Sequence, residues 1–279
     1  FGFGFSSTNI TNLVSSSGVV ATDTTGVGTS RHGLAAAGYG GDKAIFGYGA
    51  GVTNLTNLVS NAGVVATDTT GVGTARIVLA AASYGGDKAI FGYGDSGGDT
   101  YVSMSNLVSS SGVVADDVTG VGTGRSGLAA TGYGGDKAIF GYGYNSSARV
   151  SMSNLVSNSG VVATDVSGVG TARDSSAATG YGGDKGIFGY GDTGSKVSLT
   201  NLVSNIGVVG SDVTGVGTAR RGLAAAGYGG DKAIFGYGTT ASNVSMTNLV
   251  SNSGVVATDV SGVGTARQLL AAAGYSLSA

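Results

Sequence analysis

The side chains best able to do chemistry in this sequence are Asp and Arg, and one spacing between them recurs. Six times along the 279 residues an Arg follows an Asp by eight positions. One charged pair could form part of an active site, whereas a pair in every unit is more typical of a contact that holds the units together. We therefore predict structural polar contacts for Asp23, Arg31, Asp68, Arg76, Asp117, Arg125, Asp165, Arg173, Asp212, Arg220, Asp259 and Arg267.

His32 is the single His of the sequence. The residue types present would allow a Ser-His-Asp triad through it, but the equivalent positions hold Ile77, Ser126, Asp174, Arg221 and Gln268. We interpret His32 as a surface loop residue and predict no catalytic residues. With one His and no Cys, neither a two-His centre nor a thiolate metal site can form. The Gly-Gly-Asp segments lack the clustered oxygens that Ca²⁺ needs, so we expect no metal and no cofactor.

Composition excludes several classes of partner. Charged residues make up 11% of the chain and the net charge is −2, so no basic field is available to hold a nucleic acid. No apolar run approaches the length of a membrane span, and we expect no membrane insertion. The 55 Gly come without Pro and among many β-branched and aromatic residues, which excludes collagen and disorder. Because the chain begins with Phe1, we expect a processed product or a segment of something longer.

Internal repeats organise the whole chain. The dipeptide Asp-Lys recurs from Asp42 to Asp231 at intervals of 45, 49, 48 and 47 residues. The segments Asn-Leu-Val-Ser and Gly-Thr-x-Arg each occur six times. No window shows the helical period, and the frequent Gly would penalise a helix. We predict a single domain, residues 1–279, built from six units.

Each unit is predicted to contain four short antiparallel strands. In one copy these are residues 223–228, 232–238, 244–251 and 255–260, with a Gly-Gly-Asp turn between the first two. Four antiparallel strands in each unit of this length are typical of a propeller blade. We therefore predict an all-β fold, a six-bladed β-propeller with four antiparallel strands per blade.

Two of these strands carry side chains suited to their expected places. The first has three Ala and a Gly, which would let the innermost strands crowd around a central channel. In the second, alternation predicts that Ala233, Phe235 and Tyr237 share one face and fill the space between blades.

The two ends of the chain are complementary. Residues 1–4 align with 46–49, the end of a second strand, whereas 270–275 read as a first strand with nothing after it. We predict that this C-terminal strand joins the N-terminal blade. Closure of this kind joins the ends of the ring and removes two exposed sheet edges.

Residues 125–143 read Arg-Ser-Gly-Leu-Ala-Ala-Thr-Gly-Tyr-Gly-Gly-Asp-Lys-Ala-Ile-Phe-Gly-Tyr-Gly. This unit resembles a kelch repeat, in which an Arg precedes the first strand and the second strand ends in paired glycines. Here the ending is Gly-Tyr-Gly, and the kelch Trp is missing. The resemblance covers all six units and implies a propeller. Residues 140–145 are also similar to RCC1-type repeats.

The phrase from Asp-Lys-Ala-Ile-Phe-Gly-Tyr-Gly to Gly-Val-Gly-Thr-Ala-Arg resembles repeats of virion and tail-fibre proteins of marine bacteriophages. This resemblance implies a virion-surface or otherwise extracellular protein that acts in structure or adhesion. Its partners would be a host-surface glycan or protein, or other virion proteins. We predict a non-enzymatic recognition or structural module. The alternative is a secreted or cell-surface carbohydrate-binding lectin.

The sialidases are the enzyme class that we considered for this sequence. Sialidases are six-bladed propellers with an Arg triad, and Asp23-Thr-Thr-Gly is distantly similar to their Asp-box. The segment is one residue longer than that box and lacks its Trp, and without Glu the usual Tyr–Glu nucleophile pair is missing. We therefore predict that the protein is not an enzyme.

Two zones vary between the units: the two residues after the repeated Arg, and the connection between the second and third strands. In an up-and-down blade both connections lie on one side of the disc. The other two connections lie on the opposite side and hardly vary. We predict that the varied face binds a partner, with contacts from His32, Tyr101, Tyr144, Arg149, Asp174, Arg221 and Gln268.

Overall fold

The computed structural model describes residues 1–5 and 8–275. Within these residues the chain forms strands β1 to β17 and no helix, so the predicted all-β class is confirmed. Accordingly, the described part contains no helix long and apolar enough to cross a membrane. The predicted domain boundary at residue 279 lies outside the described residues.

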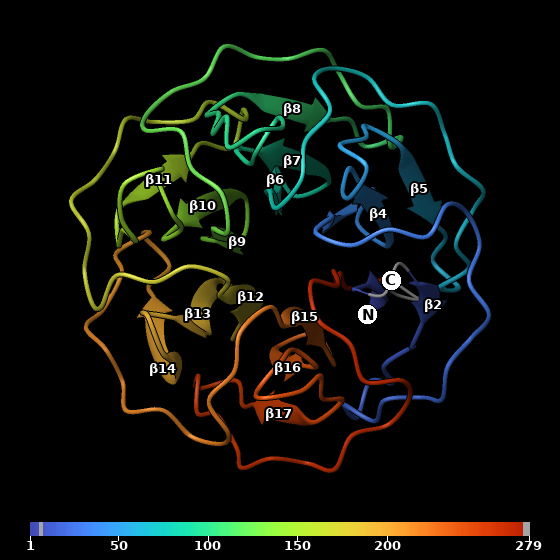
Figure 1. The fold of residues 1–279 in the computed structure, drawn as a ribbon, viewed down its shortest axis with the longest axis vertical. Helices are drawn as coiled ribbons and strands as arrows, with labels where there is room; N and C mark the ends of the chain where they lie inside the picture. Colours follow the sequence, from blue (N-terminus) through green and yellow to red (C-terminus); the bar gives the residue numbers. More distant parts are fainter. Residues whose placement is uncertain (6–7, 276–279) are drawn as a thin grey trace.

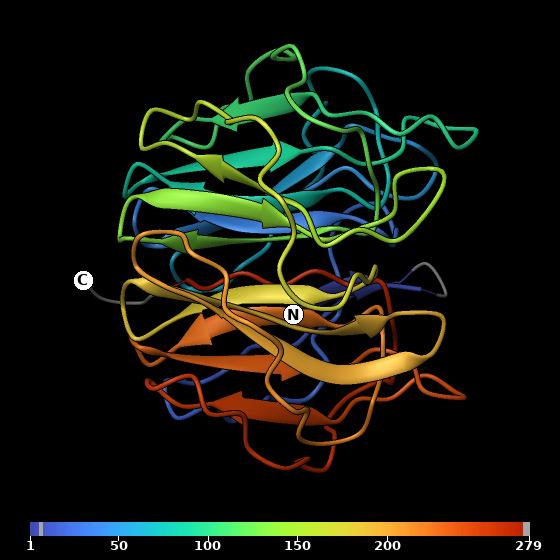
Figure 2. The same cartoon turned by 90° about the vertical axis from the view of Figure 1, so that its left-hand side faces the viewer.

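The strands form antiparallel sheets that follow one another along the chain. Five sheets have three strands each, β3-β4-β5, β6-β7-β8, β9-β10-β11, β12-β13-β14 and β15-β16-β17, and β1-β2 make a two-stranded sheet. Figure 1 shows these sheets around a central axis, and Figure 2 shows the strands running between the two faces of the disc. The bounds are β1 Gly2–Gly4, β2 Thr8–Thr11, β3 Ala35–Tyr39, β4 Lys43–Gly47, β5 Thr56–Val59, β6 Ala80–Tyr84, β7 Lys88–Gly92, β8 Ser105–Val108, β9 Ala129–Tyr133, β10 Lys137–Gly141, β11 Ser153–Val156, β12 Ala177–Tyr181, β13 Lys185–Asp192, β14 Lys196–Val203, β15 Ala224–Tyr228, β16 Lys232–Gly236 and β17 Thr247–Val250.

A tight hairpin joins the first two strands of each three-stranded sheet. Between β3 and β4, Tyr39 pairs with Lys43, and the turn holds Gly40 and Gly41 with φ of 63° and 81°. Only Gly adopts this left-handed backbone without strain. The second strand then lies between two partners, and its Ile45 is fully buried.

The fourth strand predicted for each unit does not form as a strand. Residues 255–260 meet β17 only at isolated bridges, Val250 with Val256 and Thr247 with Val260. Between these bridges the side-chain amide of Asn248 donates to Ala257 O at 3.0 Å. A side chain therefore takes a backbone acceptor at the outer edge, which interrupts the regular ladder.

The prediction that Phe235 and Tyr237 share one face is wrong. Phe235 packs on Tyr190 of the preceding sheet with 5.2 Å between ring centroids, whereas Tyr237 packs on Phe1 beside β1 at 5.1 Å. β16 ends at Gly236, and Tyr237 has a φ of 65°. Alternation holds only for an extended backbone, and a left-handed aromatic residue sends its side chain to the other face.

This arrangement recurs between all neighbouring sheets. The glycine inside each aromatic motif has a steric reason, since a Cβ on Gly141 would lie 2.8 Å from the ring of Phe188. The aromatic pairs across the sheets are Tyr48–Phe91, Tyr93–Phe140, Tyr142–Phe188, Tyr190–Phe235, Tyr237–Phe1 and Phe3–Phe46.

Both ends of the described chain contribute to the same part of the molecule (Figure 1). Gly2 N donates to Ala271 O at 2.8 Å, and Ala271 N donates to Gly2 O at 3.1 Å. Phe5 N donates to Gln268 O at 2.7 Å. Residues 268–271 thus lie beside β1 on the side opposite to β2.

Candidate binding face

The repeated Arg is a buried link between units. Arg220 is 0% exposed. Its Nε donates to Tyr237 O at 2.9 Å, its Nη1 to Thr218 O at 3.1 Å and its Nη2 to Asn248 Oδ1 at 2.6 Å. The guanidinium carbon lies 4.3 Å from the ring centroid of Tyr190 in the preceding sheet. Hydrogen bonds within its own unit and a cation–π contact to its neighbour make this residue a bracket.

The other five Arg residues lie in the same setting. All six are at most 1% exposed, and each guanidinium carbon lies 4.0 to 4.8 Å from an aromatic centroid. Burial lowers the pKa of Arg220 below its ordinary value. The stacked pairs are Arg31 on Phe3, Arg76 on Tyr48, Arg125 on Tyr93, Arg173 on Tyr142, Arg220 on Tyr190 and Arg267 on Tyr237.

The repeated Asp lies next to this bracket and accepts hydrogen bonds. Asp259 accepts from Thr218 N at 3.0 Å, from Thr218 Oγ1 at 2.6 Å and from Asn248 Nδ2 at 2.9 Å, while Arg220 Nη1 is 3.8 Å away. Desolvation alone would raise its pKa, but the hydrogen bonds from Thr218 and Asn248 bring the pKa below its usual value. Asn248 touches both charged residues. Sequence reasoning did not single it out, although the repeated Asn-Leu-Val-Ser contained the signal.

A cycle of backbone hydrogen bonds joins the second varied position of every unit. All six residues have φ between 52° and 63°, a region where a residue other than Gly is strained. Side chains vary here while the backbone stays the same. The cycle runs from Gly33 N to Leu269 O (2.8 Å), Leu269 N to Gly222 O (2.7 Å), Gly222 N to Ser175 O (2.9 Å), Ser175 N to Gly127 O (2.7 Å), Gly127 N to Val78 O (3.0 Å) and Val78 N to Gly33 O (2.7 Å).

The first varied position lies beside the connection between the second and third strands. Bridges join Ser126 to Tyr144 and Arg221 to Thr239. Ala50 N donates to the carbonyl oxygen of His32 at 2.7 Å. The two varied zones are therefore adjacent. We call this surface, which carries both zones, the varied face.

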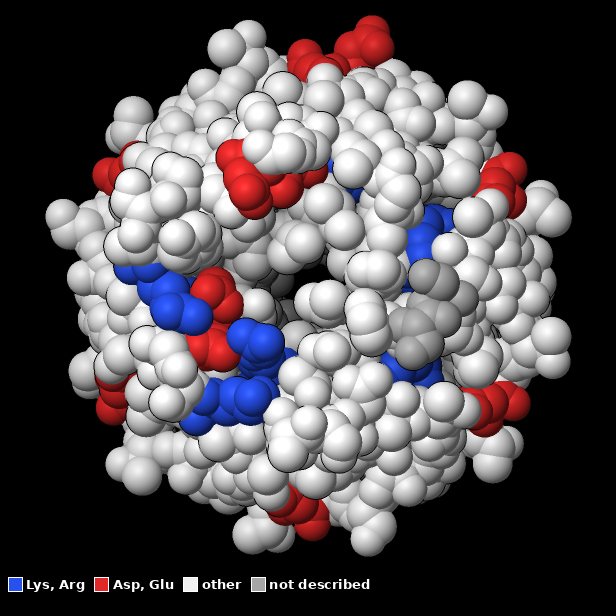
Figure 3. All heavy atoms as spheres, in the orientation of Figure 1, with Lys and Arg blue, Asp and Glu red and all other residues white. Residues whose placement is uncertain are grey.

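Four charged residues from three units form one network on the varied face. Arg149 Nε lies 3.0 Å from Asp174 Oδ2, and Arg149 Nη2 lies 3.0 Å from Asp192 Oδ1. Arg221 Nη1 lies 2.9 Å from Asp192 Oδ2. Figure 3 shows blue and red side chains gathered beside the central opening. Desolvation alone would raise the pKa of Asp192. The hydrogen bond from Gly194 N and the two guanidinium groups bring this pKa below its usual value. Sequence reasoning named three of these residues and missed Asp192.

The remaining predicted contact residues form aromatic pairs or lie close to one. Tyr101 and Tyr144 meet edge to face with 6.0 Å between centroids. His32 meets Phe5 at 5.2 Å, and burial lowers the pKa of His32. Gln268 is half-buried, and its carbonyl oxygen accepts from Phe5 N. The predicted residues thus form three local groups and do not converge on one pocket.

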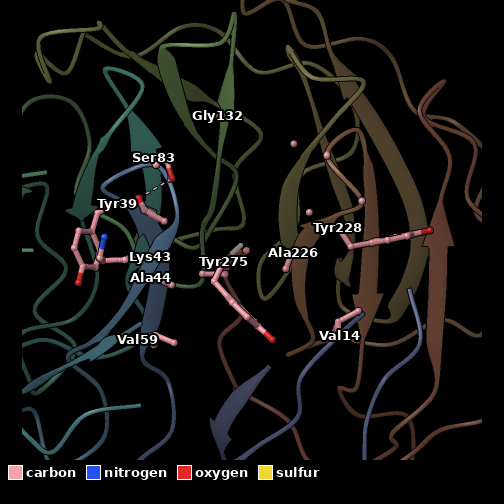
Figure 4. Close-up of a pocket in the computed structure, with 18 of the residues that line it drawn as sticks. Val14, Tyr39, Lys43, Ala44, Val59, Ser83, Gly132, Ala226, Tyr228 and Tyr275 are labelled. Carbon is pink, nitrogen blue, oxygen red and sulfur yellow. Dashed lines mark hydrogen bonds between the residues drawn. The ribbon is translucent and has the colours of Figure 1, made fainter. Parts of the chain in front are cut away.

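A cavity of about 950 Å³ lies among the inner strands near their hairpin turns, away from the varied face. Figure 4 shows its wall, where Ser83 Oγ donates to Gly38 O at 2.9 Å, and Tyr275 between Ala44 and Ala226. Sequence reasoning predicted a channel of small residues but no cavity at this end. Six lining residues are equivalent across the units, namely Gly38, Ser83, Gly132, Gly180, Gly227 and Gly274.

These groups can support noncovalent binding through charge, aromatic surface and backbone polarity. Within residues 1–5 and 8–275, no group of three or more His, Cys, Asp or Glu side chains could hold a metal ion. No protein-family model and no curated protein matches this chain.

Proposed function

We propose that the chain is a closed six-bladed β-propeller in which the edge segment of each unit acts as an irregular fourth strand. Three features support this architecture: the six-membered hydrogen-bond cycle, the six aromatic pairs and the contact of Gly2 with Ala271. In this reading residues 270–275 are the first strand of the blade that contains β1 and β2. The kelch-like Arg before each first strand is then the bracket between blades.

We propose that this propeller is a non-enzymatic recognition module. The observation that carries this proposal is that the side chains that differ between units gather on one face, beside a cycle of backbone hydrogen bonds that is the same in each unit. The charged network of Arg149, Asp174, Asp192 and Arg221 gives this face a polar side, and Tyr101 with Tyr144 gives it an aromatic one. Such groups suit a glycan or an extended peptide at the surface of another particle.

The resemblance of the repeated phrase to phage repeats supports display on a virion or tail fibre, outside the cell. A host-surface glycan or protein, or another virion protein, would then be the partner. Weak single contacts would gain strength from several copies on one particle. A secreted or cell-surface lectin is the second candidate. The half-exposed ring pair Tyr101–Tyr144 favours it, because sugar rings pack on aromatic faces.

Binding to a glycan array and to host cells tests the proposal with two sets of variants. One set changes the varied face by Tyr101→Ala, Tyr144→Ala and Arg221→Ala. The matched set changes the opposite side of the molecule by Lys43→Ala and Lys137→Ala, next to the hairpin turns. The side chains of these two residues are exposed to nearly the same extent as that of Arg221. We expect loss of binding with the first set alone. Unchanged binding in the first set, or loss only in the second, would reject the varied face.

A further inference from the structure

One sheet differs from the others in strand length, at the place where the charged network lies. β13 and β14 have eight residues each, whereas the second and third strands of the other three-stranded sheets have five and four. The added length extends the hairpin to Asp192, which pairs with Lys196. Asp192 therefore lies on a paired strand, which holds a side chain in place more precisely than a loop does.

Asp192 holds two guanidinium groups at the surface of the varied face. Its side chain is 7% exposed, and its two oxygens accept from Arg149 Nη2 at 3.0 Å and Arg221 Nη1 at 2.9 Å. The side chains of Arg149 and Arg221 are 32% and 44% exposed. Figure 3 shows blue side chains around red ones beside the central opening. The carboxylate thus lies inside, and guanidinium nitrogens with unused protons face a partner.

The charges of this site cost stability that the other units do not lose. Asp174 lies directly opposite Asp192, and each donates its backbone N–H to the other. Like charges directly opposite each other destabilise a sheet. The bridged pairs at the same place in other units contain no two like charges: Ile77–Asp95, Ser126–Tyr144 and Arg221–Thr239. Those units are held by the buried Arg bracket without such a network, so the network is not needed to join units.

Ser176 interrupts a set of buried leucines beside this network. It is 9% exposed, and its Oγ is buried without a hydrogen-bond partner in the part of the chain that the structure describes. Buried polar atoms are nearly always paired in native proteins. A Cβ on Gly191, the residue before Asp192, would lie 3.2 Å from the Cβ of Ser176. The residues at its position in the other units are 5% or 6% exposed, namely Leu34, Leu79, Leu128, Leu223 and Leu270.

We propose that Arg149 and Arg221 bind the carboxylate of an acidic sugar, and that Ser176 bonds to a hydroxyl group of the same sugar. Guanidinium groups match a carboxylate through paired charge-assisted hydrogen bonds. Lys196 adds a third positive charge against the two negative charges of the network, so the site as a whole favours an anion. An acidic peptide side chain fits less well, because it offers no hydroxyl group to Ser176. This inference rests on the proposed recognition role of the varied face and names the chemistry of its ligand.

NMR titration of residues 1–279 with sodium glucuronate tests the proposal, with the guanidinium signals of Arg149 and Arg221 as the readout. We expect both signals to shift. The methyl ester of glucuronic acid should bind about tenfold more weakly, because it loses the charge-assisted contact. Acetylglutamate amide has a carboxylate but no hydroxyl group, and it should also bind more weakly than glucuronate. No binding of glucuronate, equal affinity for acid and ester, or tighter binding of the glutamate compound would overturn the proposal.

Variants taken from the repeat itself provide the controls. Ser176→Leu restores the residue of the other units, so it should keep Tm while it weakens glucuronate binding by about tenfold. Arg221→Gln, which copies Gln268 of the next unit, should weaken binding to a similar extent. Gln268→Ala should leave binding unchanged. Glucuronate binding that is the same in all three variants would overturn the proposed location.

This titration uses neither a glycan array nor a host cell, so it can fail independently of the proposed function. Tyr101→Ala and Tyr144→Ala could abolish binding to host cells while glucuronate and its ester bind alike. That result would overturn the carboxylate site and leave the varied face as the recognition surface. The opposite result, glucuronate binding at Arg221 with host binding unchanged in Arg221→Ala, would support the site and count against the proposed function.

Discussion

Replacing Arg267 with Met tests the bracket where it joins the two ends of the chain. Arg267 Nε donates to Phe3 O at 2.7 Å, Nη2 to Asn12 Oδ1 at 2.6 Å and Nη1 to Thr265 O at 3.0 Å, over the ring of Tyr237. Met fills part of the space but leaves these acceptors without a donor. Leaving a buried hydrogen-bond acceptor without its donor costs about 1–3 kcal/mol. We expect a loss of that size in the free energy of unfolding.

Arg220→Met is the matched variant. Arg220 makes the same three kinds of contact at 2.6 to 3.1 Å, but its partners lie within 28 residues along the chain. Arg267 reaches partners 255 and 264 residues away. Both variants should lose similar free energy. Only Arg267→Met should let the sheet of β1 and β2 separate from residues 268–271.

Urea unfolding and limited proteolysis measure these two effects. We expect equal shifts of the urea midpoint and faster cleavage near the chain ends in Arg267→Met alone. A loss below about 1 kcal/mol in both variants would refute the bracket, since ordinary surface changes cost less than that. Equal cleavage patterns would refute the special role of Arg267 in joining the ends.

Two further changes test the packing between sheets and the backbone cycle. In thermal unfolding, Gly141→Ala should destabilise the protein by about 1–3 kcal/mol through overpacking against Phe188. Gly180→Ala is the control and should be near neutral, because a Cβ there has its nearest neighbour at 3.5 Å. Ser175→Gly should raise stability by about 1 kcal/mol because it relieves a φ of 52°, and a loss of stability in urea unfolding would contradict strain at this position.

The repeat and its turns could be predicted from the sequence because they depend on local chemistry. Gly-Gly-Asp after an Ala-rich strand fixes a hairpin, and the sheet register follows from it. Equal spacing of Asp and Arg indicated a contact in every unit. The contact itself also needed Asn248, whose role appears only when strands from one unit are brought together.

Two features depend on backbone geometry that residue types do not reveal. Tyr237 is left-handed although aromatic residues strongly avoid that region, so alternation placed its side chain on the wrong face. The hydrogen-bond cycle runs through Val78, Ser175 and Leu269 as well as through Gly. Five of its six bonds join residues about one repeat apart, and the sixth joins Gly33 to Leu269 near the two ends of the described chain. At these positions the side chains differ between units although the backbone conformation is the same, so residue types could not predict the shared geometry.

Hydrogen exchange at the amides of this cycle tests the central claim, closure of the ring, most directly. Gly33 and Leu269 make the one bond of the cycle that spans the chain ends, at 2.8 Å. Gly127 and Ser175 make an equivalent bond inside the chain, at 2.7 Å. A closed propeller predicts that the Gly33 amide is protected within about tenfold of the Ser175 amide, because both open only with the whole ring. Rapid exchange at Gly33 with slow exchange at Ser175 would contradict closure.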